Sequence, residues 1–94
     1  MSVRVHVRDG FPSRVWLGGP DIQRPIPVSL HTGDGEILAS ISDDVPIHGV
    51  GATFTDALTD LRAALTDHLR TLTATDDLTD DLKAQREYLR AHLA

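Results

Sequence analysis

The sequence contains no cysteine and very few aromatic side chains. Without a thiol the chain can form neither a disulfide framework nor a thiolate metal site, which fits the reducing cytoplasm that we predict as its location. The 94 residues include one Trp, one Tyr and two Phe, so the core must be mainly aliphatic. No apolar run approaches the ~18 residues of a membrane span, and the N-terminus lacks an apolar signal segment. We therefore expect no membrane association.

Positive charge is also scarce. Nine Lys and Arg against fourteen Asp and Glu give a net charge of −5, with residues 1–24 at +2 and residues 25–94 at −7. Binding nucleic acid without regard to sequence depends on Lys and Arg neutralising phosphates, so direct nucleic-acid binding is not expected. An acidic body instead suits a basic partner, and we predict a basic protein.

Motifs for catalysis, metal binding and cofactor binding are missing as well. The chain has no phosphate-binding glycine loop and no serine in a nucleophile elbow. Its histidines lack metal-ligand spacing, and these are His6, His31, His48, His68 and His92. Three pairs of adjacent aspartates, such as Asp43 and Asp44, could hold a cation or serve a hydrolase, but adjacent residues rarely converge on one atom. We therefore predict a protein that is not an enzyme, with no catalytic residue, no metal and no cofactor.

The N-terminal half has the patterns of β-strands. Valines alternate with polar residues over residues 2–8, which predicts a half-buried strand, and a short strand is expected over residues 14–17. Residues 25–31 and 36–41 predict a hairpin, because Gly33, Asp34 and Gly35 between them tolerate positive φ. Pro25 and Pro27 predict that the first of these strands enters the sheet at an edge or becomes regular only after Pro27. Residues 42–49 should form a loop, and residues 50–52 a brief strand.

The C-terminal half has the pattern of helices. Thr53 is a suitable N-cap for a helix that begins at Phe54 and ends near residue 75, and Asp56 is placed to support that cap. A second helix is expected from about Asp77, capped by Thr75 or Asp76. Because no Gly or Pro occurs from residue 53 to residue 94, one long bent helix remains an alternative. The predicted class is α+β: a small antiparallel meander packed on one long helix, plus a C-terminal helix.

Three consecutive segments resemble the HicB-like family of bacterial antitoxin domains. They read I-P-V-S-L-H-T-G-D-G-E-I-L-A-S-I-S, then D-D-V-P-I-H-G, then G-A-T-F-T-D-A-L-T-D-L-R-A-A-L. The last segment matches the family pattern at Gly51, Thr53, Asp56, Ala57 and Leu58, with Asp56 in place of the usual glutamate. The resemblance covers residues 25–72 and implies a partial ribonuclease-H-like core, in which a three-stranded meander precedes a helix. We therefore expect one domain over residues 1–94, which consists of an N-terminal extension (1–24), a core (25–74) and a C-terminal helix (75–94).

The resemblance also implies a function. HicB-like proteins bind and inactivate a small basic toxin that cuts messenger RNA, and many carry a DNA-binding segment that this chain is not expected to have. We therefore predict an antitoxin or inhibitor whose acidic body covers a basic partner protein. The predicted partner-binding residues lie in the loop before the long helix, and they are Asp43, Asp44, Ile47 and His48.

The alternative function is a homo-oligomeric structural or regulatory protein without a toxin partner. A small core with few aromatics favours self-association. In the second predicted helix one face is apolar, and its members are Leu78, Leu82, Leu89 and Leu93; we predict that they form an oligomer interface. Trp16 could anchor an interface too, although a core position is the favoured interpretation.

Overall fold

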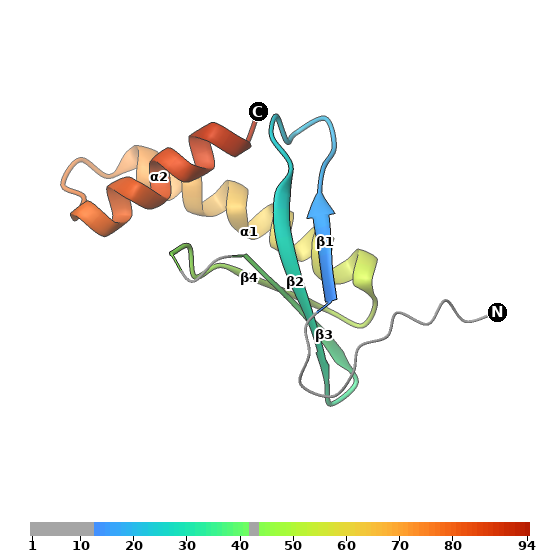
Figure 1. Cartoon of the computed structure of the whole chain (residues 1–94). Coiled ribbons are helices and arrows are strands. Elements are labelled where there is room, and N and C mark those ends of the chain that lie inside the picture. The colour runs from blue at the N-terminus through green and yellow to red at the C-terminus, as the bar shows by residue number, and fades with distance from the viewer. Residues whose placement is uncertain (1–12, 42–43) are drawn as a thin grey trace.

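The computed structural model describes residues 13–41 and 44–94, and it has an α+β fold (Figure 1). Four antiparallel strands form one sheet in the order β1-β2-β3-β4: β1 (Ser13–Leu17), β2 (Ile26–Gly33), β3 (Glu36–Ser40) and β4 (His48–Gly51). The helices α1 (Phe54–Ala74) and α2 (Asp80–His92) follow. This confirms the predicted class, whereas the strand predicted over residues 2–8 lies outside the described residues. Within the described ranges no helix is long and apolar enough to cross a membrane.

The predicted hairpin is confirmed as β2 and β3. Asp34 and Gly35 form its two-residue turn with φ values of 51° and 78°, and positive φ at both positions is the type I′ geometry that matches the twist of the flanking strands. The expected edge position, or a regular strand only after Pro27, is wrong: β2 is an inner strand and is regular from Ile26. Pro27 is tolerated because it lies opposite Trp16 of β1, beyond the part of β2 that pairs with β3. The missing N–H of Pro27 therefore interrupts no pairing with β3.

Two glycines bring β4 into direct contact with α1. A Cβ atom on Gly49 would lie 2.3 Å from the Ala57 carbonyl oxygen, and one on Gly51 would lie 2.5 Å from the Ala57 nitrogen. His48 and Gly49 had been predicted to lie in a loop, which is wrong: they pair with Ser40 and Ala39 of β3. Packing on α1 and β3 here outweighs the low strand propensity of glycine.

The long helix begins where the sequence predicts. The Thr53 hydroxyl accepts a hydrogen bond from the Asp56 N–H at 3.1 Å, and Thr75 is the C-cap. The first half of α1 packs under β3 and β4, and its second half packs against α2 (Figure 1). One helix thus carries both parts of a continuous core, whose fully buried larger side chains are Ile26, Val28, Leu30, Val45, Leu61, Leu65 and Leu89.

The second helix begins later than predicted. Its N-cap is Thr79, whose hydroxyl accepts from the Leu82 N–H at 3.4 Å, so the helix starts at Asp80 and not at about Asp77. Both Thr75 and Thr79 have extended backbone, which breaks the helical path between them. The alternative of one long bent helix is therefore wrong.

The leucine face of the second helix is covered within the single chain. Leu78, Leu89 and Leu93 are buried in the core shared with α1, and Leu82 is half-buried against it. The reason given for assigning these residues to an oligomer interface, a bare apolar face, is thus wrong. Self-association itself stays a prediction and needs another surface.

The loop between β1 and β2 closes the C-terminal end of α2. The backbone N–H groups of Gln23 and Arg24 both donate to the His92 carbonyl, at 2.9 and 3.2 Å. The Gln23 side-chain amide donates to the carbonyls of Arg90 and Ala91, at 2.8 and 3.1 Å. The last carbonyls of a helix have no partner within it, and this loop supplies donors for three of them.

The same loop is tied to α1 by an arginine. The Arg62 guanidinium contacts the Asp21 carboxylate and donates to the Gly18 carbonyl at 2.7 Å. This loop therefore connects the sheet to both helices.

Candidate functional site

A groove of about 810 Å³ lies between the loop that precedes β4 and the helix α2. In Figure 1 this loop lies on the same side of the molecule as α2. The groove is lined by side chains from β2, the loop and α2, namely Pro27, Asp44, Val45, Pro46, Asp81, Ala84, Gln85 and Tyr88. Residues 37 positions apart in sequence, Asp44 and Asp81, thus meet around one hollow.

A buried side chain and a tight turn hold the loop side of the groove. Val45 is only 1% exposed and anchors the loop in the core. The Ile47 N–H donates to the Val45 carbonyl at 2.8 Å, which closes a three-residue turn around Pro46. The fixed φ of proline suits this turn. Asp44 and Pro46 therefore reach the groove from either side of the anchored Val45.

One face of α2 forms the opposite side of the groove. Asp81, Ala84, Gln85 and Tyr88 lie at intervals of three and four, so they share one face of α2. Gln85 also fixes this helix to α1, because its side-chain oxygen lies 2.7 Å from His68 Nε2.

Tyr88 supplies the aromatic part of the lining. Its ring stacks on the ring of His92, with centroids 4.1 Å apart and planes inclined by 23°. His92 Nδ1 in turn lies 2.7 Å from the Tyr88 carbonyl oxygen. Burial raises the pKa of the Tyr88 phenol above its ordinary value of 10.0.

The groove combines apolar walls with negative charge. Its two charged lining residues are the aspartates Asp44 and Asp81, each from a different element, and no basic side chain is among its described lining. Proline rings, Ala84 and the tyrosine supply apolar surface around them. Carboxylates beside an aromatic ring and an apolar wall suit the long basic side chains, which have an apolar stem and a cationic end.

The predicted partner-binding residues divide into three groups. Asp44 lines the groove, Asp43 lies outside the described residues, and Ile47 and His48 are not part of the lining. Ile47 is half-buried against the core, and His48 is exposed on β4. Asp81 and Tyr88 were not predicted as site residues. An acid in the first turn of a helix is equally explained by the helix dipole, and no local pattern marks the tyrosine.

The described residues contain no group of three or more His, Asp and Glu side chains that could hold a metal ion. No protein-family model matches the sequence, and no curated protein or solved structure shows significant similarity to it.

Proposed function

We propose that this protein is a binding domain that holds a basic segment of a partner protein in the groove between the loop that precedes β4 and α2. The observation that carries the proposal is the placement of Asp44 and Asp81 on two sides of a groove without a basic lining residue. Both carboxylates are exposed, so an incoming cation can reach them without opening the core.

The chemistry of the groove favours a protein segment over a small ion. Two prolines, Ala84 and Tyr88 offer more apolar than charged lining, and an inorganic cation would gain nothing from that surface. A lysine or arginine side chain can pack its apolar stem on this lining and place its charged end at the carboxylates. The net charge of −7 on residues 25–94 would also speed the encounter with a basic protein.

We further propose that this binding serves a HicB-like antitoxin or inhibitor, whose partner is a small basic toxin. Support comes from the order of elements, because β2, β3 and β4 form a meander that α1 follows, as the resemblance implies. The motif residues have matching local roles: Thr53 caps α1, while Ala57 is buried beneath Gly51. The strand β1 before this core and the helix α2 after it are additions, and α2 forms one side of the groove.

A short arginine-rich peptide tests the groove directly, with binding followed by isothermal titration calorimetry at low salt. Asp44→Asn and Asp81→Asn should each weaken binding about 1.4- to 5-fold, because an exposed ion pair contributes ~0.2–1 kcal/mol. Added salt should weaken wild-type binding. Asp67→Asn is the matched control: it removes the same charge from a carboxylate that lies 3.2 Å from Arg70 on α1.

Equal binding by wild type and both groove variants would remove the groove from the proposal. The antitoxin assignment has a separate test, which is whether a neighbouring reading frame encodes a small basic protein that co-purifies with this chain. Loss of that complex in the Asp44→Asn, Asp81→Asn double variant, but not in Asp67→Asn, is the expected result.

A further inference from the structure

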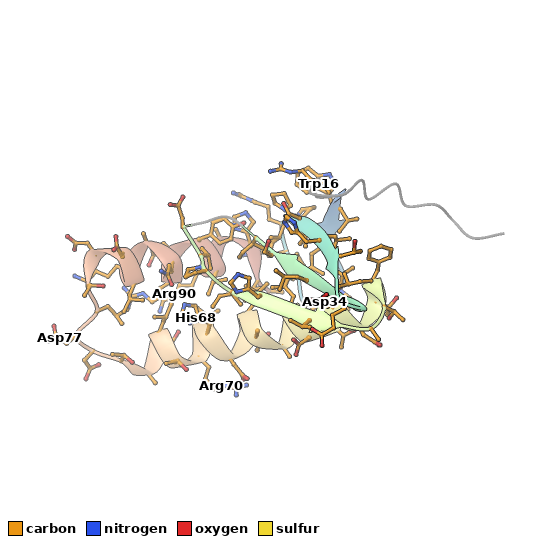
Figure 2. All side chains as sticks on the ribbon, turned by 90° about the horizontal axis from the view of Figure 1, so that it is seen from below. Trp16, Asp34, His68, Arg70, Asp77 and Arg90 are labelled. Carbon is orange, nitrogen blue, oxygen red and sulfur yellow. The ribbon has the colours of Figure 1, made fainter. Side chains whose placement is uncertain are left out.

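The sheet has a second face, opposite α1, which we call the outer face. Strand register defines it: Trp16 of β1 lies opposite Pro27 of β2, and Leu38 of β3 lies opposite Val50 of β4. Side chains alternate along a strand, so the residues directly before and after each of these four point the other way, toward the core. Figure 2 shows Trp16 on the side of the sheet away from Arg70 of α1.

Two exposed apolar side chains lie on the outer face, at opposite corners of it. Trp16 of β1 lies in the row of Pro27 and Val50 of β4 in the row of Leu38, and the row between them is polar: Arg14, Ser29, Ser40 and His48. Trp16 is 71% exposed and Val50 is 43% exposed, and these are the two large hydrophobic side chains left exposed within the described ranges. The favoured core position for Trp16 is thus wrong. The leucines of α2 are buried or half-buried, whereas the outer face carries an exposed apolar side chain on each of its two edge strands.

The charge on this face is unlike that of the rest of the molecule. Among the described strand residues its one carboxylate is Glu36, at the hairpin end, while Arg14 of β1 projects beside Trp16 on the same side. The whole chain has a net charge of −5. Two copies therefore repel each other least when they meet through the outer face, because other approaches bring acidic surfaces together.

We propose that the outer face is a self-association surface, on which a second copy of this chain packs sheet against sheet. The outer face carries a Trp and an Arg, and its strand carboxylate lies at the margin. This composition is typical of protein interfaces. A single-stranded nucleic acid fits less well, because Arg14 is the only fixed positive charge among the described outer-face residues, against a net charge of −5.

The size of the face sets the strength of the contact. Four strands ~4.8 Å apart, with about three rows of side chains ~7 Å apart, cover on the order of 400 Å². A standard interface buries about 800 Å² on each partner. The expected dimer is therefore weak and in rapid exchange, and it forms at high micromolar protein.

Sedimentation velocity over a range of protein concentrations, at low and high salt, tests the proposal. We expect the mass to rise from monomer toward dimer with concentration, and added salt to strengthen the dimer, since salt screens the repulsion between two acidic chains. Contact through the acidic groove and a basic patch would have the opposite salt dependence. Because Trp16 is the only tryptophan, its emission should move to shorter wavelength as the dimer forms.

Trp16→Glu should weaken the dimer at least about tenfold, because a buried tryptophan anchor is replaced by a charge that repels the other copy. The residue is exposed in the single chain, so circular dichroism and the melting temperature should stay close to wild type. Ala63→Glu is the control, since it adds the same charge at an exposed position of α1 and should leave the dimer intact.

A protein that stays monomeric at high salt and high concentration would overturn the proposal, as would a dimer that Trp16→Glu does not weaken. A monomer whose Trp16 emission responds to a single-stranded oligothymidylate would reassign the outer face to nucleic acid. None of these outcomes alters the peptide-binding test, which depends on Asp44 and Asp81.

Discussion

Gly49 is the residue on which the close contact between β4 and α1 depends. A methyl group there would lie 2.3 Å from two backbone atoms, the Ala57 oxygen and the Leu61 nitrogen, and backbone cannot move aside as a flexible side chain can. Gly49→Ala should therefore lower the free energy of unfolding by ~1–3 kcal/mol or more, because strand and helix must separate. Urea denaturation measures the change.

Gly18 provides the matched control for this substitution. An added Cβ there meets nothing within 4 Å, and the backbone φ is not in the positive region. Gly18→Ala should stay within about 0.5 kcal/mol of wild type. Equal effects of the two alanines would mean that β4 and α1 are not in direct contact.

Tyr88 makes stability depend on alkaline pH. Burial raises the pKa of the folded phenol above the ordinary 10.0, so the unfolded chain ionises first as the pH rises. The contribution of this group to stability is complete below pH 10.0 and decreases as the pH rises toward the folded pKa. Tyr88→Phe should remove this part of the alkaline decline.

The direct measurement uses the fact that Tyr88 is the only tyrosine. Ultraviolet absorbance of the phenolate should give a higher midpoint for the folded protein than for the protein in urea. Coincident midpoints, with folding verified by circular dichroism, would show that the phenol is fully solvated and would weaken its place in the groove.

Among the elements, α2 depends on a side chain from a distant loop. The Gln23 amide donates two hydrogen bonds to the last turn, and Gln23→Ala leaves those carbonyls to water. Each such bond contributes ~0.5–1.5 kcal/mol, so we expect a loss of about 1–3 kcal/mol and faster amide exchange in the last turn of α2. Arg24→Ala is the control, because Arg24 supports the helix through its backbone N–H only.

Local signals explain which elements the sequence predicts well. The turn at Asp34 and Gly35 and the cap at Thr53 are set by residues within a few positions, and both are found as predicted. The start of α2 was misplaced because Thr75, Asp76 and Thr79 are all competent caps. In the structure Thr79 is the cap, and the neighbouring Leu78 is buried in the core, which is tertiary packing that no local pattern specifies.

The candidate site was less accessible to sequence reasoning. Asp44 was identified from its loop, but its neighbours across the groove, Asp81 and Tyr88, come from an element more than 35 positions away. No local pattern distinguishes an acid that stabilises a helix dipole from one that also lines a groove. Gly49 likewise reads as a loop residue until α1 is packed against it.

At the scale of the whole molecule, the sheet and α2 share one core because both pack on α1. This helix is long enough to reach both, since it has 21 residues and rises ~1.5 Å per residue. Leu89 is fully buried in that core, so Leu89→Ala should cost ~2–5 kcal/mol. We expect far-ultraviolet circular dichroism and Trp16 fluorescence to report the same lowered melting temperature, although Trp16 is on the sheet. Separate transitions would mean that α2 folds independently of the sheet.

The loop that closes α2 has a consequence for the order of folding. The meander and the first part of α1 form from neighbours in sequence, whereas Gln23 and His92 are 69 positions apart and must be joined by a large loop closure. Contacts of such long range are entropically costly before the rest of the structure exists to support them. Docking of α2 is therefore expected after the rate-limiting barrier, so weakening this contact should speed unfolding and leave the rate of folding unchanged.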